Sequence, residues 1–149
     1  MTTTYTTTTT TGRAGFPLRT FFVPFPFVCF TLALVTDIAY WRTSFLMWSN
    51  FSSWLIFAGL VFGAIGLVAG LIDMLRRSTR IWGPGWAAAI AYILMLAVAI
   101  LNSFVHAADG WTAVVPNGLI LSAVTVVLAV VTVLLAARRR SRVIWSIER

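Results

Sequence analysis

Residues 51–75 read FSSWLIFAGLVFGAIGLVAGLIDML, and Asp73 is the first charged residue in this run. An α-helix rises 1.5 Å per residue, so about 20 apolar residues cross a hydrocarbon core of roughly 30 Å. The run therefore predicts a membrane-spanning helix. Three further apolar runs lie around it, and together they predict four spans at about 20–41, 51–75, 86–106 and 113–137.

The composition supports a membrane protein. Of the 149 residues, 60% are hydrophobic and only 10% are charged, whereas soluble domains carry about 25% charged residues. The alternation over about ten residues that marks a transmembrane β-strand is absent. We therefore expect an all-α membrane protein that forms an antiparallel four-transmembrane-helix bundle.

The positions of the basic residues predict the orientation. All 11 are arginines, and positive charge collects on the cytoplasmic side of a membrane protein. Only Arg42 falls on the side opposite to the others. Both termini and the middle loop are therefore predicted to be cytoplasmic (N-in/C-in). The ten arginines on that side are Arg13, Arg19, Arg76, Arg77, Arg80, Arg138, Arg139, Arg140, Arg142 and Arg149.

These arginine clusters also bear on binding partners. The sequence pI of about 11.4 is typical of nucleic-acid binding, but the arginines lie between or beyond the apolar runs, and we expect no nucleic acid. Anionic lipids are the expected partners of the clusters. A membrane-protein partner or a homo-oligomer also fits a chain that is mostly membrane-embedded.

The two ends of the chain differ from the middle. Residues 1–15 are rich in threonine and offer no apolar face, so they are predicted to be disordered. Residues 16–137 form the predicted four-helix domain, and residues 138–149 form a basic cytoplasmic tail. Six tryptophans fall at the ends of the spans, as in an aromatic belt: Trp41, Trp48, Trp54 and Trp111 on one side, Trp82 and Trp86 on the other.

Small and polar residues follow the helical repeat within the spans. A glycine face is predicted to allow close helix packing, and it consists of Gly59, Gly63, Gly66 and Gly70. A mildly polar core is predicted at Asp73, Tyr92, Asn102 and Ser122. Asp73 also precedes Arg76 and Arg77 at the spacing of a helix ion pair, which favours a structural role.

One candidate site lies at the outer ends of the spans. His106 is the only histidine, and it shares a helix face with Asp109 if the helix extends that far; Asp37 falls at the same boundary. Imidazole and carboxylate suit divalent metals, so these three residues are the candidate metal ligands. The alternative, which we favour, is that they hydrogen-bond each other and cap helix ends, where ionisable groups reach water at low cost.

Other chemistry has little support in the sequence. A single histidine excludes bis-histidine haem within one chain, and Cys29 is the only cysteine, so there is no Cys-x-x-Cys motif. The clustered glycines lie in apolar runs and not in a phosphate-binding loop. We therefore expect neither a catalytic site nor a resident cofactor.

Several polar and aromatic stretches resemble one known family. Over about residues 16–137 the chain resembles the bacterial membrane family called domain of unknown function 2231. The resemblance implies a four-helix bundle in the inner membrane without an established activity. Some relatives have histidines near the first Phe-Pro and early in the third helix, where this chain has none. The stretches are VPFPFVCF (23–30), ALVTDIAYW (33–41), FSSWL (51–55), GLID (70–73), LNSFVH (101–106) and DGWTAVVP (109–116).

Two classes of function remain open. The first is a non-catalytic subunit or anchor of a membrane-associated redox system, suggested by a polar outer rim on an otherwise inert bundle. The second is a small transporter or metal-handling protein with a site at Asp37, His106 and Asp109. A membrane enzyme that uses Asp37 and His106 ranks below both.

Overall fold

The computed structural model describes residues 18–76, 85–107 and 113–147, with the backbone alone at 113 and 140–147. The elements in these ranges are α1 (Arg19–Phe22), α2 (Pro24–Thr43), α3 (Leu46–Leu75), α4 (Trp86–Ala107), η2 (Ala113–Gly118) and α5 (Leu119–Ile147). Residues 1–15, predicted to be disordered, lie outside the described residues.

Within the described ranges, four helical stretches are long and apolar enough to cross a membrane. They have 25, 30, 22 and 26 residues, which exceeds the minimum for a bilayer core in every case. The prediction of an all-helical chain with four candidate spans is therefore confirmed. The stretches are Arg19–Thr43, Leu46–Leu75, Trp86–Ala107 and Val114–Arg139.

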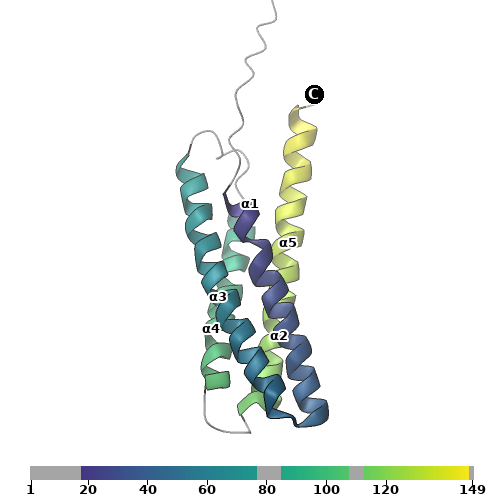
Figure 1. The fold of residues 1–149 in the computed structure, drawn as a ribbon. Helices are drawn as coiled ribbons and strands as arrows, with labels where there is room; N and C mark the ends of the chain where they lie inside the picture. Colours follow the sequence, from purple (N-terminus) through teal and green to yellow (C-terminus); the bar gives the residue numbers. More distant parts are fainter. Residues whose placement is uncertain (1–17, 77–84, 108–112, 148–149) are drawn as a thin grey trace, which may run out of the picture.

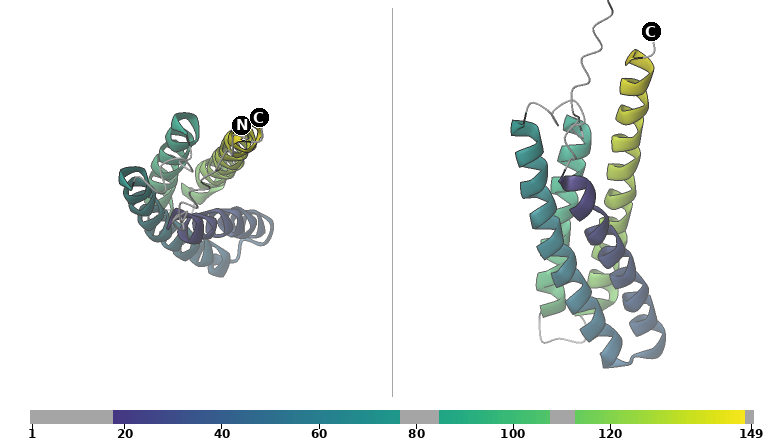
Figure 2. Two further views of the ribbon diagram at one scale, coloured as in Figure 1. Left: turned by 90° about the horizontal axis from the view of Figure 1, so that it is seen from above. Right: turned by 45° about the horizontal axis from the view of Figure 1, so that its top comes forward.

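The long helices lie side by side (Figures 1 and 2). The largest contacts join α2 to α3 and α4 to α5, and smaller contacts join α2 to α5 and α3 to α4. One end of the molecule holds the α2–α3 connection and η2, and we call it the turn end. The other end holds α1 and the C-terminal part of α5 (Figure 1). We call it the arginine end, because Arg19, Arg76, Arg138 and Arg139 lie there.

The first span ends in a tight turn that fixes the position of the second. Ser44 has left-handed backbone angles (φ 55°, ψ 20°), and its N–H donates to the Tyr40 carbonyl at 2.7 Å. This is a common way for a helix to end. Helix α3 then begins at Leu46, five residues before the predicted start at 51. The apolar run was the basis of that prediction, but backbone hydrogen bonds continue a helix through polar side chains such as Ser49.

The fourth span differs from its prediction at both ends. Val115 has extended backbone angles (φ −124°, ψ 120°), as expected of a residue that precedes a proline. Pro116 therefore delays the regular helix to Leu119, although a continuous helix from 113 was predicted. At the other end α5 runs to Ile147, ten residues past the predicted limit of the span. Arginine is a good helix former, so the basic sequence does not stop the helix.

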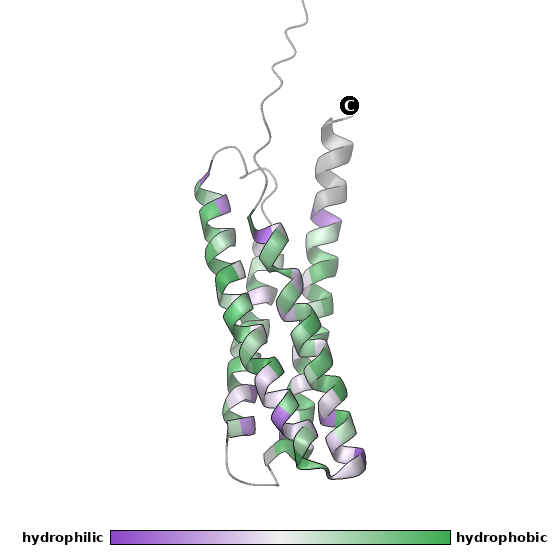
Figure 3. Cartoon of the chain, in the orientation of Figure 1, coloured by the Kyte–Doolittle hydropathy of each residue, from purple (hydrophilic) through white to green (hydrophobic). Residues whose placement is uncertain are grey.

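The interior is small, and the outer surface is apolar. The core includes Phe30, Met95, Ala99 and Ala129, each at most 3% exposed. Large hydrophobic side chains such as Val35 point outward on every long helix. Figure 3 shows hydrophobic residues along most of the length of the helices that it colours. An apolar surface of this extent matches a lipid environment, because lipid tails are as apolar as these side chains.

The predicted glycine face receives large side chains, not neighbouring backbone. A Cβ added at Gly59 would lie 2.5 Å from Phe30 Cε1, and one added at Gly63 would lie 2.5 Å from Leu96 Cδ2. Gly66 gives similar room to the hydroxyl of Tyr92, at 2.8 Å. At Gly70 no heavy atom of another described residue lies within 4 Å of that position. Three of the four glycines thus form pockets for side chains of α2 and α4.

Candidate functional site

Asp37 lies on α2 about two turns from the turn end, and its side chain is fully buried. His106, one residue before the end of α4, places Nε2 3.0 Å from Asp37 Oδ1. The His106 side chain is only 1% exposed. The structure thus brings together two of the three residues that the sequence placed at the outer boundary. Both side chains are buried, and Ser122 of α5 and Gly118 of η2 lie against them.

Two neutral residues complete this group. Ser122 of α5 donates its hydroxyl hydrogen to Asp37 Oδ2. Asn102 of α4 donates from Nδ2 to Ser122 Oγ at 2.8 Å. All four residues belong to one hydrogen-bonded group, the Asp37 cluster (Asp37, Asn102, His106, Ser122), which joins α2, α4 and α5. Two predicted polar-core residues, Asn102 and Ser122, are thereby placed beside the candidate site.

The geometry fixes the number of protons in the cluster. His106 Nδ1 lies 3.0 Å from the Asn102 carbonyl oxygen, which can only accept, so Nδ1 carries a hydrogen. The contact between Nε2 and Asp37 Oδ1 needs one further hydrogen, because two bare lone pairs would repel each other. The pair is thus either carboxylate with imidazolium or carboxylic acid with imidazole. Both arrangements have zero net charge, which suits a buried position.

Gly118 leaves room for the imidazole ring of His106, because it has no side chain. A Cβ at this position would lie 2.8 Å from His106 Cε1 and 3.3 Å from Nδ1. A ring that is hydrogen-bonded at both nitrogens has little freedom to move away. In the sequence, the feature that marks this packing position is a glycine two residues after Pro116, just before the regular helix α5 starts.

A second polar contact joins α2 to α3. The hydroxyl oxygens of Thr36 and Ser52 are 2.7 Å apart, and Ser52 Oγ donates to the Ala33 carbonyl at 3.3 Å. Ser52 is fully buried. The sequence does not predict this contact, because the two residues lie on different helices.

Asp73 makes hydrogen bonds at the arginine end, opposite to the Asp37 cluster. Its carboxylate oxygens accept hydrogen bonds from the backbone N–H groups of Leu18 and Arg19, at 3.2 and 3.1 Å. These amides open α1, where N–H groups lack partners within the helix and favour negative charge. The expected role of Asp73 was support of its own helix through Arg76 and Arg77. The structure also connects Asp73 to a residue pair 54 and 55 positions earlier; Arg77 lies outside the described residues.

Tyr92 joins α4 to α3. Its hydroxyl donates to the Gly63 carbonyl at 3.0 Å, and the hydroxyl lies over Gly66. A carbonyl within a helix already accepts one backbone hydrogen bond and retains a second lone pair. The predicted polar core is therefore not one group: Asn102 and Ser122 belong to the Asp37 cluster, while Tyr92 and Asp73 make separate contacts.

The candidate metal ligands are only partly placed. Asp37 and His106 converge, but Asp109 lies outside the described residues. Within the described ranges no three His, Cys, Asp or Glu side chains form a group suited to a metal ion. Asn102 Oδ1 is buried there without a hydrogen-bond donor. The cluster can therefore hold a proton, and it can offer one free acceptor to a polar ligand.

Within the described residues, four helices are apolar enough to span a membrane, and three of them are joined by the buried Asp37 cluster. These features define the class of the protein, a multi-span helical membrane protein. The model of the family described as predicted membrane protein (DUF2231) matches residues 15–142. The chain belongs to this family, which confirms the resemblance seen in its sequence. No curated protein and no solved structure matches the chain.

Proposed function

We propose that the protein is a non-catalytic subunit or anchor in a bacterial inner membrane. The proposal rests on one observation: the buried acids Asp37 and Asp73 both make hydrogen bonds between helices. Asp37 binds His106 and Ser122 on two other helices, and Asp73 binds the start of α1. Groups engaged in this way stabilise helix contacts and are poorly available for proton or group transfer.

The orientation in this proposal follows from charge. Arg19, Arg76, Arg138 and Arg139 lie at the arginine end, and Arg42 lies near the turn end. Under the positive-inside rule the arginine end is cytoplasmic. The helices then form an antiparallel bundle with both termini in the cytoplasm, and the Asp37 cluster lies toward the outer leaflet.

The proposed partner surface is the aromatic part of the turn end. Trp54 is 71% exposed and Phe45 is 65% exposed. Aromatic residues are enriched both at protein interfaces and at membrane boundaries. We infer that a second membrane protein contacts this end, and a redox enzyme is the partner class that we expect.

The test is recovery of partners from native membranes in nanodiscs, with the chain as bait. Co-purification of a membrane redox enzyme is the expected result, and Trp54→Ala should reduce it. Trp86→Ala is the matched control, because Trp86 is 77% exposed but lies at the arginine end. Recovery of the bait alone would count against the subunit proposal, and recovery unaffected by Trp54→Ala would exclude the turn end.

A second candidate function is metal or ion handling at the Asp37 cluster. It is favoured by the convergence of Asp37 and His106 and by the free acceptor of Asn102. Metal analysis of the purified protein after exposure to Zn²⁺ tests it, with His106→Ala and Asp109→Asn as variants. The wild type should retain Zn²⁺ and both variants should lose it; equal metal content in all three proteins excludes this site.

A further inference from the structure

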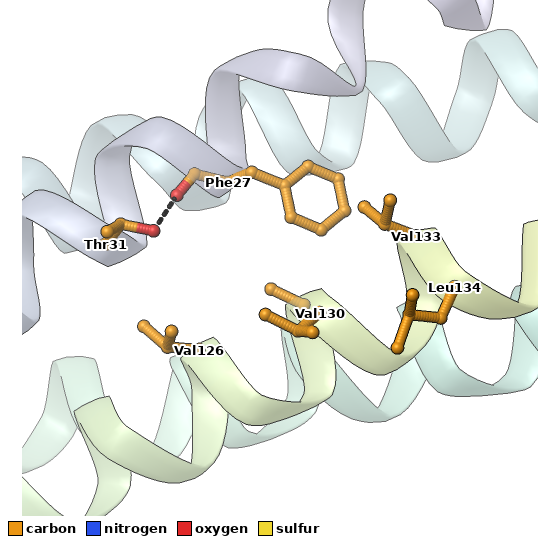
Figure 4. Close-up of a pocket in the computed structure, with 7 residues that line it drawn as sticks. Phe27, Thr31, Val126, Val130, Val133 and Leu134 are labelled. Carbon is orange, nitrogen blue, oxygen red and sulfur yellow. Dashed lines mark hydrogen bonds between the residues drawn. The ribbon is translucent and has the colours of Figure 1, made fainter. Parts of the chain in front are cut away.

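An apolar groove of about 240 Å³ separates parts of α2 and α5 (Figure 4). Its lining includes one hydroxyl, but Thr31 Oγ1 donates to the Phe27 carbonyl at 2.7 Å and so is satisfied within α2. The groove therefore offers no free hydrogen-bond donor from that side chain. The labelled lining residues are Phe27 and Thr31 of α2, and Val126, Val130, Val133 and Leu134 of α5.

The groove opens sideways, toward the surroundings of the bundle. Val130, Val133 and Leu134 are each at least half exposed, whereas Ala129 at the base is 3% exposed. For helices that span a bilayer, sideways means toward lipid. The residues on α5 extend from Val126 to Leu134, which is about 12 Å along the helix axis. The groove is thus elongated along the membrane normal, in the direction of an acyl chain.

A basic group lies just beyond one end of the groove. Phe27 is near Val133 in Figure 4, so these residues mark the end closer to the arginine end. Arg138 follows Leu134 by four residues, and positions four apart are neighbours on a helix surface. Its side chain is exposed. Guanidinium groups bind phosphate through paired N–H donors, and anionic phosphates line the cytoplasmic leaflet.

The described surroundings of this end favour an anionic ligand. Among the described side chains, the acid at the arginine end is Asp73, and its oxygens accept the Leu18 and Arg19 amides. Arg139 lies close by, with its guanidinium near Gly85. An apolar groove that leads to a cluster of arginines is complementary to one kind of molecule, an anionic amphiphile.

We propose that the groove between α2 and α5 seats an acyl chain of an anionic phospholipid whose phosphate is bound by Arg138. The proposal goes beyond the subunit or anchor function, and it rests on the orientation proposed above, in which the arginine end is cytoplasmic. The occupant is a lipid of the surrounding membrane, and not free phosphate, because the phosphate contact accounts for only one end of the site.

Native mass spectrometry of the purified protein, released from nanodiscs with equal phosphatidylglycerol and phosphatidylcholine, tests the proposal. We expect one phosphatidylglycerol to be retained preferentially. Val130→Trp fills the groove and should reduce its retention at least fivefold. Val127→Trp is the matched control, because Val127 is 61% exposed and does not line the groove; retention should not change.

The headgroup contact has its own pair of variants. Arg138→Gln should lower phosphatidylglycerol retention about fivefold, since one arginine near an anionic surface contributes about that factor. Arg42→Gln, at the turn end, should leave it unchanged. Circular dichroism and gel filtration verify that each variant is folded. If Val130→Trp does not fold, Val133→Phe provides the same test from the next turn.

Three results would overturn the proposal. Equal retention of the two lipids would remove the headgroup preference. Loss of lipid in Arg138→Gln but not in either groove variant would indicate phosphate bound at the surface without a seated chain. A protein dimer that dissociates on Val130→Trp would identify a second copy as the occupant.

Discussion

The most direct test of the Asp37 cluster replaces Asp37 by two residues of similar size. In Asp37→Asn the amide oxygen still accepts from Ser122, and the amide N–H donates to His106 Nε2. The imidazole is then neutral and keeps its Nδ1 hydrogen on the Asn102 carbonyl. Both interhelix hydrogen bonds survive, and in the one to His106 the donor and acceptor are exchanged. Asp37→Leu removes both and leaves Nε2 and the Ser122 hydroxyl without these partners.

The magnitudes follow from the two contacts, to His106 Nε2 and to Ser122 Oγ. Interhelix hydrogen bonds in membranes average about 0.6 kcal/mol, with a maximum near 1.7 kcal/mol. Asp37→Leu should therefore lower the free energy of unfolding by about 1–3 kcal/mol. Asp37→Asn should cost less than about 1 kcal/mol, because it exchanges polarity without loss of contacts.

Equilibrium unfolding of the purified variants in mixed micelles with increasing dodecyl sulfate measures these changes, with far-ultraviolet circular dichroism as the signal. The double variant Asp37→Leu/His106→Phe isolates the pair, and its coupling energy should fall within about 0.6–1.7 kcal/mol. If Asp37→Asn proves as damaging as Asp37→Leu, the cluster requires a carboxyl group at this position, and the proposed exchange of polarity is refuted.

Three further predictions concern packing and orientation. Gly63→Val should destabilise the protein by about 1–3 kcal/mol by overpacking against Leu96, while Gly70→Val should change stability by less than about 0.5 kcal/mol; the same micelle titration compares them. Gly118→Ala should displace the His106 ring and abolish the coupling energy of the Asp37–His106 pair, and an unchanged coupling energy would refute the packing role of Gly118. Fused to the C-terminus, green fluorescent protein should be fluorescent and alkaline phosphatase inactive, and the opposite result would reverse the proposed topology.

The sequence predicted the features that depend on local composition. Apolar runs of sufficient length gave the four candidate spans, and the family resemblance rested on polar and aromatic marks within them. Element boundaries were less accurate. Val115 leaves the helical region because of Pro116, and α5 continues through arginines that have high helix propensity.

Most contacts between helices could not be predicted from the sequence. Asp73 had a plausible ion-pair partner three residues away, but the structure also connects it to amides more than 50 residues distant. Asp37 was expected near water because of its place along the chain. Its burial depends on how α4, α5 and η2 pack around it, and single-helix periodicity does not specify that arrangement. The neighbours of a helix face cannot be deduced from the residues of that face alone.

The wide separation of the Asp37 contacts has a consequence for biosynthesis. The partners of Asp37 lie 69 and 85 residues later in the chain, so at about 5–20 residues per second their synthesis takes several seconds or more. Thr36 and Ser52 are only 16 residues apart, and this contact can form as soon as the second helix is made. A nascent chain that stops before the fourth span leaves Asp37 Oδ2 without its serine donor. The hydrogen bonding of Asp37 is therefore complete only when the fourth span has joined the bundle.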